Sequence, residues 1–280
     1  MKLSNLGGVL AVVLCLVAEA PVCADPQYAN DDTRRVVEAM VDAHGGIERW
    51  RAVPSIRYDD LMHMEGHEGG QFGWWVAHEV IDQKTRQVWQ DWPMENSSIG
   101  FDGKEVWSEN WRQGNPTAMM VHFFYYFVNL PWLTQDEGVV LSAVGKENWD
   151  GIDKELYKVE MTFDGAPSVG KSARDFFTLY IDPDTFRLVS YQYGSGYAPL
   201  IALMGMPEGS VFGPMWRVIT HYEEVGGLLF PTAFRTMPEP NGRILGDHII
   251  MNIDVSTPFE AEKAAKPEGA VVFPGPLRTD

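Results

Sequence analysis

From residue 55 onward, the chain consists of short runs of aromatic and β-branched residues that are separated by turn signals. Asp102-Gly103 lies between two such runs and is the strongest kind of two-residue hairpin signal, while Asp182-Pro183 joins another pair. Strands joined by hairpins form an antiparallel meander, which keeps one face on a core and one in water. We expect about ten strands, drawn from residues 57–64, 73–81, 86–92, 98–101, 104–107, 139–144, 156–163, 176–181, 187–193, 215–223, 228–236 and 244–255.

Helical patterns precede and interrupt this meander. Asp31-Asp32 places acids where a helix N-terminus favours them, and apolar residues then recur at helical spacing up to residue 50, with Gly45-Gly46 as a stop and restart. Residues 118–130 are apolar nearly all round, so a helix there must be buried. Residues 197–207 form an apolar connection, and the Pro-, Ala- and Gly-rich tail after residue 258 is expected to lie along the surface.

The first 24 residues have the three parts of a secretory signal peptide. Lys2 supplies a positive charge, residues 6–18 are apolar, and Ala24 ends a small-residue cleavage site. We therefore expect a periplasmic or secreted protein whose residues 25–280 form a single domain. Cleavage would remove both cysteines, Cys15 and Cys23, so the mature chain could form no disulfide and no thiolate metal site.

The charge balance excludes two classes of partner. The chain has 39 Asp and Glu against 22 Lys and Arg, a formal net charge of −17. Nucleic acid and anionic lipid headgroups would both be repelled by such a surface. We expect neither a nucleic-acid-binding protein nor a polybasic membrane-surface protein.

Residues 165–172 match the phosphate-binding pattern G-x-x-x-x-G-K-[ST], with Lys171 and Ser172 at its end. A true phosphate loop opens a helix whose amides hold the phosphate. Here residues 175–181 have the pattern of a strand, so a loop between two antiparallel strands is favoured and no cofactor is expected.

His63, Glu65 and His67 are residue types that bind metal ions. On an extended strand the two imidazoles would lie about 13 Å apart, at ~3.3 Å per residue. A solvated strand end is therefore favoured over a metal site, and no metal is expected.

A glycan-active enzyme is one alternative. Four carboxylates lie among four tryptophans between residues 89 and 111, and two carboxyls beside aromatic platforms are what sugar hydrolysis requires. These residues are Trp89, Asp91, Trp92, Glu95, Glu105, Trp107, Glu109 and Trp111. No nucleophile elbow or other catalytic motif occurs in a fitting context, so a non-enzymatic protein is favoured.

The tryptophans are unevenly distributed, because eight of the ten lie between Trp50 and Trp132. A sheet with aromatic side chains on its inner face, covered by an apolar helix, could be an ordinary core or a pocket for an apolar ligand. Methionines at 119, 120, 204 and 206 lie in the two covering segments, and methionine suits surfaces that repack around varied partners.

Three short segments resemble the LolA/LolB-like lipoprotein-carrier superfamily of exported bacterial proteins. They are residues 40–50, including His44-Gly45-Gly46, the hairpin of residues 176–193 around Asp182-Pro183, and residues 253–259. The resemblance implies an α+β fold, an incomplete, curved antiparallel β-barrel with helices plugging its concave face. In the carriers this cavity receives lipoprotein acyl chains. Residues 118–130 would match a plugging helix, and residues 197–207 a loop at the cavity mouth.

Together these patterns predict a lipid or other amphiphile bound in an apolar half-barrel cavity, by a carrier or sensor of the cell envelope. Envelope lipoproteins or a membrane-bound acceptor would be the further partners. A structural envelope protein with a filled core remains the second alternative. The residues expected to line the cavity are Trp74, Trp89 and Trp107 on the sheet and Phe123, Phe124, Phe127 and Met204 on the covering segments. A one-residue shift in register would exchange the two faces of each strand.

Overall fold

The computed structural model describes residues 25–65, 74–149, 154–239 and 242–273. Their strands form one sheet whose two edges do not meet, so the barrel is incomplete. The strands are β1 (Gln27–Tyr28), β2 (Ser55–Met64), β3 (Trp74–Asp82), β4 (Val88–Trp92), β5 (Ser97–Phe101), β6 (Val106–Glu109), β7 (Val139–Leu141), β8 (Gly145–Asn148), β9 (Glu155–Phe163), β10 (Phe176–Ile181), β11 (Leu188–Ser195), β12 (Phe212–Val225), β13 (Leu228–Met237), β14 (Gly246–Asp254) and β15 (Val271–Phe273).

Two meanders make up this sheet. Strands β2 to β6 follow one another as antiparallel neighbours, and so do β9 to β14. They are joined where β14 pairs antiparallel with β2, with Ile249 opposite Leu61. The α+β class and the curved, unclosed sheet are confirmed, but the pairing of β14 with β2 places the start of the strand region in the middle of the sheet.

The described residues form a sheet of fifteen strands, whereas the sequence predicts about ten. The difference arises because some strands are too short to show a sequence pattern. β1 pairs parallel with β7, β8 pairs with β9, and β15 pairs with β6. Only two residues of β1 and three of β15 are in the sheet. Tertiary pairing, and not local sequence preference, defines such strands.

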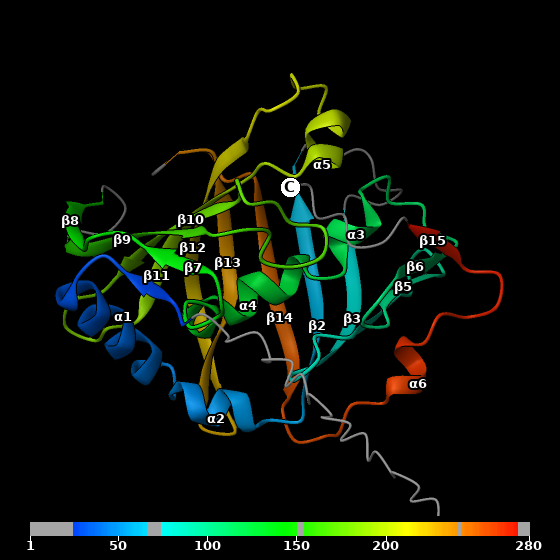
Figure 1. Ribbon diagram of the computed structural model, residues 1–280, viewed down its shortest axis with the longest axis horizontal. Helices are drawn as coiled ribbons and strands as arrows, with labels where there is room; N and C mark the ends of the chain where they lie inside the picture. Colours follow the sequence, from blue (N-terminus) through cyan, green and yellow to red (C-terminus); the bar gives the residue numbers. More distant parts are fainter. Residues whose placement is uncertain (1–24, 66–73, 150–153, 240–241, 274–280) are drawn as a thin grey trace, which may run out of the picture.

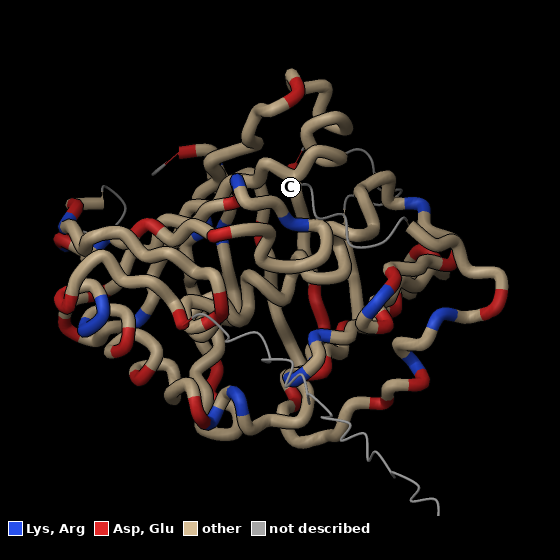
Figure 2. The backbone as a smooth tube through the Cα atoms, viewed as in Figure 1, with Lys and Arg blue, Asp and Glu red and all other residues tan. Residues whose placement is uncertain are grey.

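Helix α4 crosses one face of the sheet and fills its concavity (Figure 1). The predicted helix over residues 118–130 is two helices, α3 (Thr117–Met120) and α4 (Phe123–Leu133), and the connection expected at residues 197–207 contains α5 (Ala198–Leu203). All residues of α4 except Phe123 are buried, as its all-round apolar sequence requires. No charged residue occurs in α4, which appears uniformly tan in Figure 2.

The N-terminal helices follow the capping signals. Asn30 accepts a hydrogen bond from the Thr33 amide and starts α1 (Asp31–Ala43), and α2 (Ile47–Ala52) follows Gly45 and Gly46. Gly45 has a φ of +104°, and a Cβ there would collide with the Gly227 carbonyl, so only glycine fits. The stop and restart of the helix are confirmed.

His44 ties this helix end to the sheet. The buried ring accepts a hydrogen bond from the Leu188 amide at Nε2 and donates from Nδ1 to the Leu229 carbonyl at 2.7 Å. Burial, partly offset by the bond to Leu229, lowers the pKa of His44 to about 4. The His-Gly-Gly segment thus joins α1 to β11 and β13 as a neutral structural contact.

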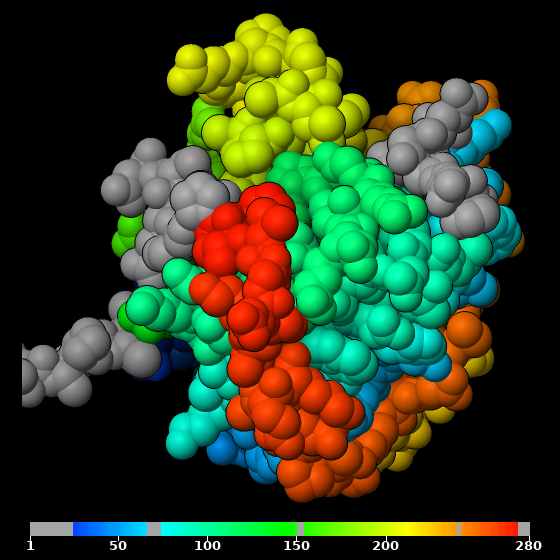
Figure 3. Space-filling model, turned by 90° about the vertical axis from the view of Figure 1, so that its right-hand side faces the viewer, coloured from blue at the N-terminus to red at the C-terminus, as the bar shows by residue number. Residues whose placement is uncertain are grey.

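The chain beyond β14 packs on the outer face of the sheet. Helix α6 (Ala261–Ala264) covers Trp107, whose Nε1 donates to the Ala264 carbonyl at 2.8 Å. Figure 3 shows this segment, in orange and red, lying across the blue-green surface that includes β4 to β6. The signal-peptide prediction concerns residues 1–24, which lie outside the described residues.

Candidate functional site: an apolar cavity under helix α4

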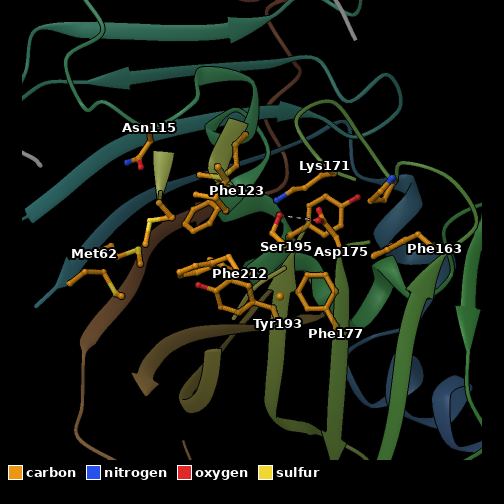
Figure 4. A pocket seen from close by; sticks show the side chains of 18 of the residues that line it. Met62, Asn115, Phe123, Phe163, Lys171, Asp175, Phe177, Tyr193, Ser195 and Phe212 are labelled. Atoms are coloured by element: carbon orange, nitrogen blue, oxygen red, sulfur yellow. Dashed lines mark hydrogen bonds between the residues drawn. The ribbon is translucent and has the colours of Figure 1, made fainter. Parts of the chain in front are cut away.

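A cavity of about 130 Å³ lies between the sheet, α4, α5 and the loop that joins β9 to β10 (Figure 4). Most of its wall is apolar: aromatic rings from five strands and from α4 meet there, with four methionines. An apolar cavity of roughly 150 Å³ binds benzene, so this one has room for a group of about that size. The apolar lining includes Met62, Met64, Trp75, Met119, Phe123, Tyr126, Phe127, Phe163, Phe177, Tyr193, Leu200, Met204 and Phe212.

The alternation of each strand decides which side chains reach the cavity. In β2, Met62 and Met64 point inward, and in the neighbouring β3 Trp75 does so. Met62 and Met64 are two residues apart, as the two-residue period of a strand requires. In β11, Tyr193, Gly194 and Ser195 all line the cavity, at a point where the pairing of β11 with β12 is irregular.

Phe123 and Phe127 lie one helical turn apart on α4, and their ring centroids are 4.7 Å from each other. Both line the cavity. Phe124 points elsewhere, because the next residue of a helix is rotated by about 100°. Its fully buried ring packs 6.0 Å from that of Trp92 and 5.3 Å from that of His248, measured between centroids.

One wall of the cavity is polar. Lys171 lies beside Ser195 and Phe123 in Figure 4, and its Nζ is 5.6 Å from the centroid of the Phe123 ring and 5.0 Å from that of Tyr126. Burial lowers the pKa of Lys171, while the charge of Asp175 opposes this change. Asn115 also lines the cavity, and its buried Nδ2 has no hydrogen-bond partner among the described residues.

Both carboxylate oxygens of Asp175 accept hydrogen bonds from neighbouring residues of the fold. Its Oδ1 accepts hydrogen bonds from the Ser195 hydroxyl and the Gly196 amide, each at 2.8 Å. Its Oδ2 accepts from the Ser172 amide at 3.1 Å. These bonds fix the loop between β9 and β10 against the end of β11.

A buried polar cluster lies under α4 outside the cavity lining. Arg217 Nη2 donates to His248 Nδ1, and His248 Nε2 donates to Asp60, both at 2.6 Å. The guanidinium carbon of Arg217 lies 4.2 Å from the centroid of the Phe127 ring. Burial, reinforced by Arg217, holds the pKa of His248 well below its usual value, so this histidine is neutral.

Glu79 belongs to the same face of the sheet. Its carboxyl group accepts hydrogen bonds from the Tyr58 hydroxyl at 2.5 Å and from Gln90 Nε2 at 2.6 Å. Burial raises the pKa of Glu79 to about 8, although both hydrogen bonds lower it. The concave face is therefore an aromatic surface that also contains two buried polar clusters, and not a purely hydrocarbon one.

Three of the predicted cavity residues do not reach the cavity. Trp74 is 44% exposed and packs on His63, and Trp89 lies on the outer face under Lys263. Trp107 is 1% exposed because α6 covers it. All three occupy the outward positions of their strands, so the choice of face was wrong by one residue, whereas the inward residue Trp75 lines the cavity.

On the covering segments, Phe123, Phe127 and Met204 line the cavity and Phe124 does not. The lining residues that were not predicted come from β2, β3, β9 to β12, the β9–β10 loop, α3 to α5 and the segment before α3. Met62 and Phe177 belong to predicted strands, so knowing which face of each strand points inward would have predicted both as lining residues. The position of Lys171 depends on how its loop folds back, for which the sequence has no signal.

The phosphate-binding pattern is a loop between antiparallel strands, as favoured. Residues 165–172 follow β9, and the chain then enters β10 and not a helix. Gly170 has a φ of +72°, and a Cβ there would collide with the Ala118 carbonyl, so the glycine serves the packing of the loop on α3.

The four carboxylates of the glycan alternative do not all lie at one site. Glu95 accepts a hydrogen bond from Gln113, Glu105 pairs with Lys266, and Glu109 accepts from Ser98. Glu95 and Glu105 lie beyond opposite ends of β5. Asp91 and Glu109 lie on the outer face of the sheet, on either side of Ser98. Trp107, which precedes Glu109 on β6, is covered by α6 and is only 1% exposed.

The metal hypothesis lies partly outside the described residues, because His67 is not among them. In the described part of the chain, no three histidines, cysteines or carboxylates converge in a way that could hold a metal ion. None of the described helices has both the length and the apolar character needed to cross a membrane.

No family model and no curated protein matches the chain. Several solved structures do. A DUF1329 family protein from Desulfovibrio piger is 11% identical and matches 84% of this chain and 98% of its own, with a TM-score of 0.49. A LolA superfamily protein from Nitrosomonas europaea is 8% identical, with 84% and 97% covered and a TM-score of 0.49. A putative outer membrane lipoprotein-sorting protein domain from Vibrio parahaemolyticus is 7% identical, with 83% and 96% covered and the same TM-score.

Proposed function

We propose that this chain binds a lipid or other amphiphile in the cavity under α4 and acts as a carrier or sensor in the cell envelope. The observation that carries the proposal is the cavity itself, an apolar space walled by aromatic rings and methionines. Burial of apolar surface, at ~25 cal/mol per Å², is the force that would retain a hydrocarbon chain there.

The methionines explain how a space of about 130 Å³ could take a longer chain. Met62, Met64 and Met119 have unbranched side chains that can change rotamer at little cost, so the space between sheet and helices can extend as a chain enters. Met204 on the connection after α5 is 50% exposed and lies at the mouth. Lipoproteins or a membrane-bound acceptor in the envelope would then supply or receive the ligand.

Native mass spectrometry of residues 25–280, followed by solvent extraction, would identify a retained lipid. Uptake of a neutral probe, dodecanol, tests the site. Met204→Gln should weaken dodecanol binding about fivefold, because an apolar contact of ~1 kcal/mol is lost. Leu203→Gln is the matched control, since Leu203 is 51% exposed and does not line this cavity. A bare mass together with no dodecanol uptake would refute the proposal.

A further inference from the structure

The Lys171 ammonium group is the feature of the cavity that apolar binding does not use. It lies against two aromatic rings, Phe123 and Tyr126. Within the described part of the chain it forms no ion pair and no hydrogen bond. A partly buried ammonium without a paired anion is costly, and it gains most when an anion is placed beside it.

The other charged groups around Lys171 already have hydrogen-bond partners within the fold. All three hydrogen bonds to Asp175 come from the fold. Arg174 donates from Nη1 to the Gly209 carbonyl at 2.6 Å and from Nη2 to the Gly196 carbonyl at 3.1 Å. His122 is neutral, because burial lowers its pKa to about 4, and it bonds to the Arg86 carbonyl. Lys171 is thus the cation of this wall that has no ion-pair or hydrogen-bond partner among the described residues, although it packs on two rings and the Asp175 charge lies near it.

The loop also holds the lysine in place. Gly170 is pressed against the Ala118 carbonyl, and Asp175 fastens the other side of the loop to Gly196 on the chain after β11. The backbone at Lys171 is therefore held at the wall of the cavity, and the ammonium group packs there on the Phe123 and Tyr126 rings. A fixed cation beside an apolar space is complementary to a molecule with an anionic head and a hydrocarbon tail.

We propose that the ligand is a single-chain carboxylate amphiphile of the fatty-acid class, with its carboxylate paired to Lys171 and its tail in the cavity. This inference rests on the proposed function. One lysine offsets one negative charge, so the site fits a carboxylate, which carries a single charge. A phosphate would be a poorer fit, because its usual partners are the forked guanidinium groups of arginine. The rings of Phe123 and Tyr126 exclude water from one side of the pair and so strengthen it.

Dodecanoic acid and dodecanol test this head-group preference, because they share one tail. With residues 25–280 at pH 8, the acid should bind about tenfold more tightly than the alcohol, equivalent to ~1.4 kcal/mol. Lys171→Met should remove that preference by weakening the acid about tenfold and leaving the alcohol unchanged. Lys171→Arg keeps the charge and should retain most of the preference.

Lys84→Met is the matched control, because Lys84 is exposed on the turn between β3 and β4. It should leave both affinities unchanged. Equal binding of acid and alcohol by the native chain would overturn the inference while leaving the proposed function standing, and this comparison needs no variant to fold. Equal weakening of both probes in Lys171→Met would also overturn it. If neither probe binds, the proposed function falls and the inference with it.

Discussion

Two adjacent phenylalanines of α4 have different roles, and substituting each one separates ligand binding from stability. Phe124 is fully buried between Trp92 and His248 on the sheet side of the helix. Phe123 is half-buried and faces the cavity. Because they are neighbours in one helix, Phe123→Ala and Phe124→Ala change helix propensity equally.

Phe124→Ala should lower the free energy of unfolding by about 3–5 kcal/mol, the range for truncating a fully buried phenylalanine. Phe123→Ala removes a ring that already borders empty space, so about 1–2 kcal/mol is expected. Binding should show the reverse order. Phe123→Ala removes a wall of the cavity and should weaken dodecanol binding about fivefold or more, whereas folded Phe124→Ala should bind within about twofold of the native chain.

Urea unfolding followed by tryptophan fluorescence measures the free energy of unfolding, and calorimetric titration measures the affinity for dodecanol. The equilibrium slope must be the same for all three chains if the changes reflect native-state packing. The reasoning is refuted if Phe124→Ala costs less than about 1 kcal/mol. It is refuted equally if both variants lose the same affinity, since the cavity would then not lie on the Phe123 face of α4.

Two further substitutions test the loop and the buried carboxyl. Gly170→Ala should destabilise the chain by ~2 kcal/mol more than Gly165→Ala in urea unfolding, because both glycines have positive φ but only a Cβ at 170 meets the Ala118 carbonyl; equal losses would contradict this. Burial raises the pKa of Glu79 to about 8 in the folded chain, so its contribution to stability is lost as pH rises from about 4.5 to 8. The free energy of unfolding of Glu79→Gln, relative to that of the native chain, should therefore increase by up to about 1.4 kcal/mol per pH unit across that window, as measured by urea unfolding. A pH-independent difference would argue against a buried, protonated Glu79.

The sequence predicts the strands well because their signals are local. The turns at Asp102-Gly103 and Asp182-Pro183 fix two hairpins, and the Gly45-Gly46 break appears where α1 ends. β15 has no such signal, because its three residues become a strand only by pairing with the edge strand β6. The pairing of β14 with β2 joins residues about 190 positions apart, which no local pattern specifies.

Of the residues expected to line the cavity, Trp74, Trp89 and Trp107 lie on the outer face of the sheet, whereas Phe123 and Phe127 of α4 line the cavity. Tryptophan occurs on both faces of this sheet, with Trp74 outward and Trp75 inward, so hydrophobicity does not reveal the register. The outer face can bury Trp107 because α6 covers it, a contact with no sequence signal. On α4, Phe123 and Phe127 are one turn apart, and the helical period alone places them together.

Lys171 shows how topology decides what a motif can do. In a parallel sheet, a glycine-rich loop with a terminal lysine leads into a helix whose free amides face a phosphate. Here the same letters connect antiparallel strands β9 and β10, and the amide of Ser172 is occupied by Asp175. Gly170 packs against the Ala118 carbonyl, and of the four residues that the pattern specifies, Gly165, Gly170, Lys171 and Ser172, Lys171 is the one that lines the cavity. A cation that would bind phosphate beside a helix stands here beside an apolar cavity, so the fold and not the motif decides which ligand chemistry the lysine can serve.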